Sequence, residues 1–437
     1  MKRNPIPFII LAIFAIIGIF VPLVADFDGS KVYNSGDAAW MLMSTALVLL
    51  MTPGLSFFYG GMVSKKNVIS TMMQSFIATG LISVLWIVVG FGLAFGPSIG
   101  GFIGNPSEFF MMRGINGKEA WSLAPTIPLL LFALFQMKFA IITPALVVGA
   151  TAERIRFTSY ILFMVLFSLF IYAPIAHWTW HPDGFLFKMG VLDFAGGTVV
   201  HISAGCAALA GAIVLKRRQV HITKEEVKPA RIPYVLLGTG LLWFGWFGFN
   251  AGSAVGATSL SVDAFANTNT ASAAAGLSWI FFDMLRGRRP SALGFCIGAV
   301  VGLVAITPAA GFVGVPQSIF IGFIAAICSN LAVHWKGKTT IDDTLDVFPC
   351  HGIGGIVGMI MTGVFSSKAI NPVGTDGLIY GGTDFFVKQL AGCGIVVAFS
   401  LVMGFILFKI VDVLNPIRVT VEEEEIGLDV TQHAESL

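Results

Sequence analysis

The chain has 437 residues, of which 56% are hydrophobic and only 11% are charged, and its mean hydropathy is +0.85. This composition excludes a soluble globular protein and predicts an all-α membrane protein. The formal net charge of +2 gives no indication of nucleic-acid binding, and we expect none.

Residues 1–25 form the first apolar run, which begins after Lys2 and Arg3 and ends at Ala25. This pattern is typical of a secretory signal peptide, although Leu23 is large for its place before the cleavage site. An uncleaved extra N-terminal helix is the alternative. Either interpretation leaves residue 30 outside the membrane.

Eleven charge-poor segments of membrane-spanning length follow. They are 38–62, 67–95, 122–151, 157–178, 194–215, 232–257, 264–282, 290–310, 316–335, 346–366 and 385–411. We therefore expect one transmembrane domain over residues 30–411 and a short polar tail over residues 412–437. The five cysteines lie in these helices without metal or redox spacing, so we interpret them as small core residues.

The basic residues predict the orientation. Fifteen Lys and Arg fall in the loops that this topology places inside, and six fall outside or at outer helix ends. The positive-inside rule then puts the N-terminus outside and the C-terminus in the cytoplasm. The basic residues are spread over the inner loops, where anionic membrane lipid explains them.

Two histidines occupy matching places in two matching helices. Helices one to five end at the helix with His201, and helices six to ten end at the helix with His351. Because five is odd, the second set enters from the opposite side, which gives a 5+5 inverted repeat. Each histidine follows an aspartate, Asp193 or Asp343, by eight residues, or about 12 Å of helix. In a hydrocarbon core about 30 Å thick, both rings should lie near the midplane.

A histidine inside a membrane helix is costly, so the pair predicts a pore or a binding site. Two alternatives stay open. In one, each ring is a core side chain bonded to a neighbouring carbonyl. In the other, the rings ligate a haem, although no second ligand pair lies at this depth. Asp193 and Asp343 stand at helix starts, where a carboxylate is expected to cap free backbone N–H groups. We expect no cofactor.

Aromatic side chains gather at the outer ends of three helices. The segments are LFQMKFA at 134–140, HWTWH at 177–181 and GWFGFNAGSA at 245–254. They offer one vestibule the side chains of Phe135, Phe139, Trp180, Phe249 and Ser253. Desolvated aromatic faces attract cations by about 2 kcal/mol or more. An ordinary interfacial aromatic belt is the alternative. His177 and His181 have metal-pair spacing, but no third ligand is evident, so we expect no metal.

These segments resemble the ammonium transporter (Amt/Rh) family, in particular its bacterial Amt branch. The matching motifs are FFYGG at 57–61, GATAERIRF at 149–157, DFAGGTVVH at 193–201, GWFGFNAGSA at 245–254, DDTLDVFPCHGIGGIVG at 342–358 and EIGLDV at 425–430. Together they cover nearly the whole chain, from the first core helix to the tail.

The resemblance implies a transporter rather than an enzyme, in the plasma (inner) membrane, with eleven helices per subunit in a homotrimer. It implies that Phe135, Trp180 and Ser253 recruit ammonium. It also implies that Phe139 and Phe249 form a gate. His201 and His351 match the twin pore histidines, and Asp193 matches an aspartate that shapes the recruitment site. The tail matches a segment that couples subunits and meets P-II type signal proteins.

The implied mechanism is physically sensible. Moving a bare cation into hydrocarbon costs on the order of 20 kcal/mol, and one cation–π contact does not offset that cost. Neutral ammonia avoids it, so ammonium should lose its proton below the recruitment site. A facing pair of neutral imidazoles can relay a proton separately, because each ring has one donor and one acceptor nitrogen.

Lys138 departs from the family pattern. It is the only formal charge between Ala120 and Ala152, and it precedes the gate residue Phe139. As a snorkelling lysine it would have no role in transport. As a cation near the entrance it would oppose ammonium, which would suit an ammonium sensor with little flux. Transporter and sensor therefore both remain open.

Overall fold

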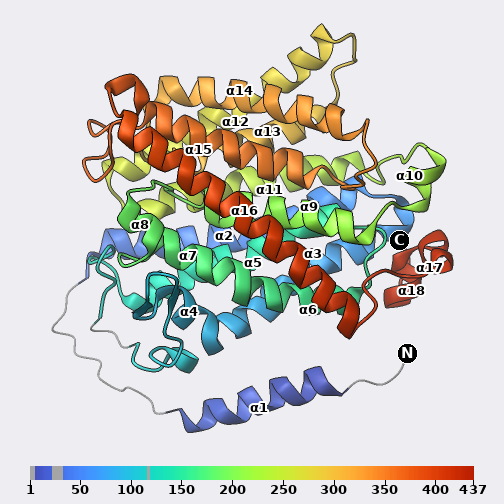
Figure 1. Ribbon diagram of the computed structural model, residues 1–437, viewed down its shortest axis with the longest axis horizontal. Helices are drawn as coiled ribbons and strands as arrows, with labels where there is room; N and C mark the ends of the chain where they lie inside the picture. The colour runs from blue at the N-terminus through green and yellow to red at the C-terminus, as the bar shows by residue number, and fades with distance from the viewer. Residues whose placement is uncertain (1–4, 22–32, 116–118) are drawn as a thin grey trace.

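A computed structural model describes residues 5–21, 33–115 and 119–437, and most of them lie in long helices packed side by side (Figure 1). Within these residues, nine helices are long and apolar enough to cross a membrane. Their bounds are Ser35–Met62, Lys65–Phe95, Leu129–Thr151, Phe157–Met189, Gly197–Leu215, Ile232–Ala254, Val315–Lys336, Phe348–Phe365 and Thr383–Leu414. The helical membrane-protein fold expected from composition is therefore present.

The two remaining predicted spans, 264–282 and 290–310, correspond to α12 (Ser259–Leu285) and α13 (Ala292–Ile306). Both pack in the bundle with α14 (Val315–Lys336). However, α13 has only 15 residues, because Pro308 follows its end, and α12 carries buried polar side chains. The count of eleven spans therefore stays a prediction.

Four of the membrane helices contain a π-helical stretch that the hydropathy pattern did not reveal. The second contains η1 (Lys65–Asn67), α3 (Val68–Leu85), the π-helical η2 (Trp86–Gly90) and α4 (Phe91–Phe95). The fourth contains α6 (Phe157–Phe167), the π-helical η4 (Ser168–Tyr172) and α7 (Ala173–Trp180). The fifth joins the π-helical η5 (Gly197–Ile202) to α9 (Ser203–Leu215), and the eighth joins the π-helical η7 (Phe348–Ile353) to α15 (Gly354–Phe365). Such turns frequently occur at functional sites.

Glycines allow the central helices to pack closely. α2 (Ser35–Met62) lies against α11 (Ile232–Ala251), where a Cβ on Gly238 would come within 2.3 Å of the Phe58 backbone nitrogen. α5 (Leu129–Thr151) begins after Pro128 rather than at residue 122. Of its most apolar stretch of 18 residues, 89% is buried. α5 therefore runs through the middle of the bundle.

The two ends of the bundle differ. At one end, a hairpin of β1 (Ser98–Ile99) and β2 (Ile103–Gly104) pairs Ser98 with Gly104. η3 (Phe110–Met112), α8 (Phe185–Met189), η6 (Gly252–Ala254) and η8 (Leu378–Tyr380) are short helices of the connections. The other end carries α10 (Gln219–Thr223) and the tail helices α17 (Val421–Ile426) and α18 (Leu428–His433) (Figure 1).

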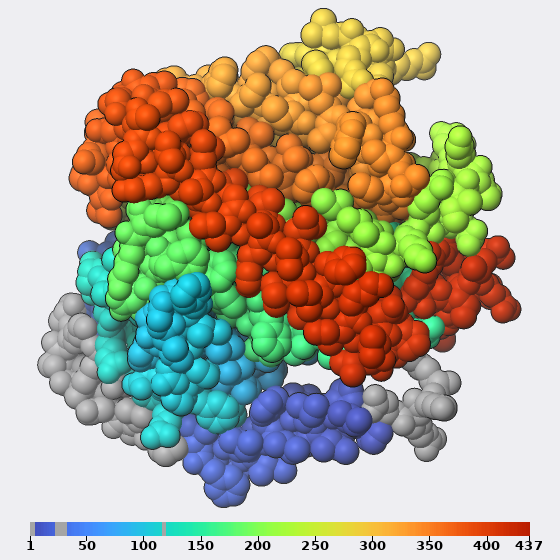
Figure 2. Space-filling view, viewed as in Figure 1, coloured from blue at the N-terminus to red at the C-terminus, as the bar shows by residue number. Residues whose placement is uncertain are grey.

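The termini complete the fold. α1 (Ile6–Phe20) is an apolar helix with no buried residue, and the predicted cleavage site at Ala25 lies outside the described residues. α16 (Thr383–Leu414) runs slightly past the predicted domain end at residue 411. The red tail and the green α10 project at the right of the molecule, and the yellow segment around the connection from α12 to α13 projects at its top (Figure 2).

Candidate functional site

The structure brings His201 and His351 together, although 150 residues separate them in the chain. Their Nδ1 atoms are 3.4 Å apart, and their rings stack with centroids 5.4 Å apart and planes at 26°. The two side chains are 1% and 3% exposed, so water reaches neither ring freely. The His201 Nε2 atom has no hydrogen-bond partner among the described residues.

Two aspartates fix the helices that carry these rings. Asp193 accepts the backbone N–H groups of Gly196, Gly197 and Thr198 at 2.7–2.8 Å. Asp343 accepts those of Val347 and Phe348 at 3.0 and 2.8 Å. Both carboxylates therefore cap the start of a π-helical segment, as expected for aspartates that precede helices.

The helices cross at glycines directly beside the rings. A Cβ on Gly205 of α9 would lie 2.2 Å from the backbone nitrogen of Gly352, so only glycine allows this crossing. Trp246 of α11 supports His201 from another side, with ring centroids 5.3 Å apart and planes at 20°. Its indole N–H donates to the Thr307 hydroxyl at 3.0 Å, which fixes the ring.

The predicted gate residues form a stack that leads to the histidines. The ring centroids of Phe139 and Phe249 are 4.2 Å apart with planes at 34°, and Phe249 lies 6.0 Å from the ring of His201. On the outer side, Phe139 meets the ring of Phe135 at 4.9 Å and that of Trp180 at 5.8 Å, both nearly edge-on. The aromatic residues expected to share a vestibule therefore form one continuous column.

The outer side chains are fixed by backbone groups. The indole N–H of Trp180 donates to the Asp193 carbonyl at 3.1 Å. The Ser253 hydroxyl donates to the Phe249 carbonyl at 2.8 Å, which leaves its oxygen lone pairs as acceptors. Phe135 is fully buried, whereas Trp180 and Ser253 are partly exposed.

Two small cavities continue the column on the inner side. The first contains His201, His351, Phe249 and Trp246 in its lining, together with apolar residues of α2, α5 and α13. The second lies on the other side of His351, beside Tyr59 and Cys350. Phe58 borders both cavities. Sequence reasoning missed Phe58 and Trp246, although both lie inside motifs that it singled out.

Lys138 is half-buried on α5 and does not form an ion pair with any described carboxylate. Among the described residues, the sulfur of Met137 is the one hydrogen-bond partner of its ammonium group, at 3.6 Å. Among the residues that the structure describes, no neighbouring side chain therefore neutralises this charge next to Phe139, the predicted gate residue.

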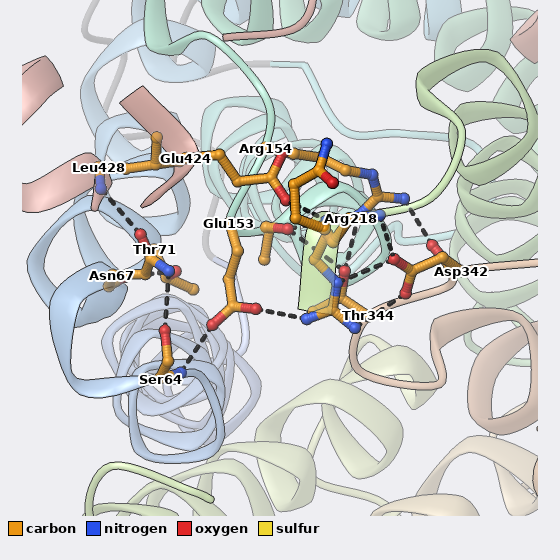
Figure 3. Close-up of polar contacts among 12 residues, drawn as sticks. Ser64, Asn67, Thr71, Glu153, Arg154, Arg218, Asp342, Thr344, Glu424 and Leu428 are labelled. Carbon is orange, nitrogen blue, oxygen red and sulfur yellow. Dashed lines mark hydrogen bonds and ion pairs between the residues drawn. The ribbon is translucent and has the colours of Figure 1, made fainter. Parts of the chain in front are cut away.

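A buried charge network joins Arg218, Asp342 and Glu153, with Arg154 beside them (Figure 3). Arg218 donates two hydrogen bonds to Asp342 at 2.8 and 2.9 Å and also pairs with Glu153. Glu153 accepts the backbone N–H of Ser64 at 2.7 Å. Arg154 is fully buried and donates to the carbonyl of Asp342 and, at 2.8 Å, to the Thr344 hydroxyl. The network joins the connections α2–α3, α5–α6, α9–α10 and α14–α15. The last of these carries Asp342 and leads directly to Asp343 and the His351 helix.

The network shifts the pKa values of its carboxylates. Burial raises the pKa of Asp342, but the hydrogen bonds of Arg218 and the charge of Arg154 outweigh burial and hold it well below its ordinary value. Burial likewise opposes ionisation of Glu153, but Arg218 and Ser64 keep its pKa below the ordinary value. Burial lowers the pKa of Arg154 to about 10. Sequence reasoning assigned no role to these residues, because their partners lie far away in the chain.

The tail docks on the chain's own connections. Glu424 is 6% exposed, pairs with Arg418 at 2.7 Å and accepts the backbone N–H of Gln219 at 2.6 Å. Asn67 accepts the N–H of Leu428 at 2.8 Å (Figure 3). The acidic run that begins at Glu422 is thus partly buried against the chain's own connections.

The Ammonium Transporter Family model matches residues 39–437. A putative ammonium transporter of Methanothermobacter thermautotrophicus is 48% identical over 92% of this chain and 98% of its own length. The ammonium transporter of Bacillus subtilis is 45% identical with the same coverage. Both relatives are named transporters, not enzymes.

Solved structures share the fold. The crystal structure of Candida albicans Mep2 is similar with a TM-score of 0.85 and 35% identity, covering 92% of this chain and 90% of that one. A structure titled Sensor Amt Protein is similar with a TM-score of 0.82 and 31% identity, covering 91% and 98%.

Proposed function

Because the chain belongs to the ammonium transporter family, we propose that it carries ammonium nitrogen across a cell membrane through the column of rings that ends at His201 and His351. The observation that carries the proposal is this column. Its ring-to-ring steps from Trp180 through Phe139 and Phe249 to His201 are 4.2–6.0 Å, and two cavities follow. Each ring comes from a different helix, so the helix packing builds the path.

Ammonium is recruited between Phe135, Trp180 and Ser253. The hydroxyl of Ser253 already donates to a carbonyl, so it meets an ammonium N–H only as an acceptor. The aromatic faces add cation–π attraction, which is about 2 kcal/mol or more at a desolvated site. A hydrophobic site with one fixed acceptor selects a small cation with N–H donors.

The cation does not pass the gate as an ion. Phe139 and Phe249 are too close together for a hydrated ion, and the idealised cost of desolvating a bare cation is on the order of 20 kcal/mol. Ammonium therefore gives up its proton at the gate, where we propose the unpartnered Nε2 of His201 as the acceptor, and ammonia passes the two histidines. Their Nδ1 atoms are close enough for one imidazole to hand a proton to the other, so we propose that the proton follows separately.

The proposed topology has eleven spans in a 5+5 inverted repeat, with the N-terminus outside and the C-terminus in the cytoplasm. The packing of α12 and α13 beside the nine apolar helices supports it, as does the bias of basic residues. As the sequence resemblance implies, the protein works as a homotrimer in the plasma (inner) membrane. The docked tail offers a cytoplasmic surface for a P-II type signal protein.

Ammonium-dependent current in proteoliposomes tests the proposal. We expect current from the wild type and little or none from His201→Ala. The matched control is His221→Ala, because His221 lies on α10 at the end of the bundle and lines neither cavity. Current that survives unchanged in His201→Ala would contradict the pore assignment.

An ammonium sensor with little flux is the second candidate. The likeness to a structure titled Sensor Amt Protein and the unpaired charge of Lys138 beside the gate favour it. The same experiment separates the two functions. A sensor binds ammonium, measured as a change in tryptophan fluorescence, without carrying current.

A further inference from the structure

Two imidazole rings stack beside Trp180 at the outer end of α7. His177 lies in the last turn of α7, and His181 directly follows the helix, so the two residues are one turn apart. Their ring centroids are 4.4 Å apart, and the ring planes differ by 20°. Both side chains are buried. The transport path described above uses neither ring.

Hydrogen bonds fix the protonation of His177. Its Nδ1 lies 2.9 Å from the carbonyl oxygen of Ala94, which can only accept, so Nδ1 carries a proton. Its Nε2 lies 2.8 Å from the hydroxyl of Ser98 in β1, which donates to the neutral ring. If the ring gained a second proton, this hydroxyl would turn and accept. His177 therefore tolerates a charge without losing a partner.

His181 has no such freedom. Its Nδ1 accepts the backbone N–H of Asp183 at 3.0 Å. A backbone N–H can only donate, so a proton on Nδ1 would place two donors face to face and break the bond. The bond belongs to the turn that joins α7 to α8, in which the N–H of Gly184 donates to the His181 carbonyl at 2.8 Å. Acid therefore opens this turn.

Few charges surround the two rings. The titratable groups that act on them are each other, Asp183 and Lys188. Asp183 and Lys188 form an exposed ion pair at 2.8 Å, and such pairs contribute little. On its other side, His181 meets the ring of Trp121 at 5.3 Å. Two imidazolium rings in this stack would repel each other, so the native stack holds at most one extra proton, which His177 accepts. Protonation of His181 therefore requires the stack and the turn to separate.

Trp180 depends on the same turn, because it is the last residue of α7 and stands directly before His181. The backbone N–H of His181 donates to the His177 carbonyl at 3.2 Å and ends the helix. The hairpin that carries Ser98 is held to α7 by the indole N–H of Trp178, which donates to the Phe102 carbonyl at 2.7 Å. When the turn opens, the last turn of α7 frays, and this strains the bond of 3.1 Å that holds the Trp180 indole to the Asp193 carbonyl.

We propose that His177 and His181 are positioning residues for Trp180, and that their stack weakens ammonium recruitment when the outer solution becomes acidic. The inference rests on the proposed function, because it needs Trp180 to bind ammonium. Recruitment has its full affinity only while His181 is neutral.

Ammonium-evoked currents on supported membranes test this inference at outer pH values between about 4 and 8. The range extends below that of free imidazole, because a buried ring beside a second imidazole gains its proton only at lower pH. His181→Gln keeps an acceptor for the Asp183 N–H but takes no proton. His221→Gln is the matched control at the other end of the bundle. We expect the apparent KM to rise in acid in the wild type and in the control. This rise should exceed that of His181→Gln by about 2- to 10-fold, which is the effect of one net hydrogen bond. Coincident pH profiles of KM in all three proteins overturn the inference.

Fluorescence gives a second readout that does not need transport. A protonated imidazole quenches a neighbouring indole, so acid should quench Trp121 in the wild type but not in His181→Gln, and Trp121→Phe should remove the difference. If none of the proteins carries current, the proposed function fails and this titration decides the inference. An identical acid quench in the wild type and His181→Gln then overturns it. Should His181→Gln not fold, His181→Asn replaces it.

Discussion

A single methyl group at Gly205 should push His201 and His351 apart. A Cβ at this position would lie 2.2 Å from the backbone nitrogen of Gly352 and 2.4 Å from its Cα, whereas ordinary contacts begin at 3.4 Å. The obstacle is backbone rather than a flexible side-chain end, so α9 and η7 would have to separate by about 1 Å.

This displacement should strongly impair proton transfer between His201 and His351 but only modestly lower the stability of the fold. The Nδ1 atoms of His201 and His351 are 3.4 Å apart, already at the far limit of a hydrogen bond, so about 1 Å more breaks the contact. Overpacking costs about 1–3 kcal/mol. A shift of about 1 Å between reacting groups can lower a rate by about 10²-fold. We expect Gly205→Ala to fold, to melt at a lower temperature and to lose roughly 10- to 100-fold of its ammonium current.

Gly240→Ala on α11 is the matched control, because a Cβ there meets nothing within 4 Å. In a helix interior, alanine is more stable than glycine by about 0.5–1 kcal/mol, so this variant should melt no lower than the wild type. Both variants are compared by current in proteoliposomes and by melting temperature in detergent. Full current and unchanged melting in Gly205→Ala would refute the reasoning about the helix crossing.

Four further outcomes are expected. Lys138→Met should raise the apparent affinity for ammonium a few-fold, the effect of about 1 kcal/mol, and identical currents and affinities would show that the lysine has no role. Arg218→Ala leaves Asp342 and Glu153 without their ion-pair partner, so it should lower the free energy of unfolding by about 3–5 kcal/mol. Lys388→Ala loses only an exposed pair with Asp384 and should lower it by about 1 kcal/mol or less. The lowered pKa values of Asp342 and Glu153 stabilise the fold fully above their ordinary values of 3.8 and 4.5, so the melting temperature should fall as the pH drops below about 4.5; a flat profile would argue against the pairing. Glu424→Ala should release the tail and speed proteolysis after Arg418, and equal cleavage rates would mean that Glu424 does not hold it.

The site could be predicted from sequence where residue type and spacing carry the signal. The aromatic segments and the aspartate–histidine pairs pointed to side chains that the fold does bring together, such as Phe139 with Phe249 and His201 with His351. Helix ends were less accurate, because Pro128 and Pro308 shorten two helices that hydropathy alone extends.

Other features gave no local signal. Trp246 resembles any interfacial aromatic residue until it is seen stacked on His201 and bonded to Thr307. The π-helical turns at both histidines do not follow from hydropathy, which measures apolar content rather than the hydrogen-bond register of a helix.

By itself, the sequence determined that this chain is a helical membrane protein with a fixed order of spans, because hydrocarbon leaves buried backbone no solution other than a helix or a closed barrel. It also determined which side chains could serve a pore. Only the tertiary structure decided which of them meet. Arg218 finds its partners 65 residues before it and 124 residues after it, and such pairings depend on how helices cross at glycines such as Gly205, not on the residues near them in the chain.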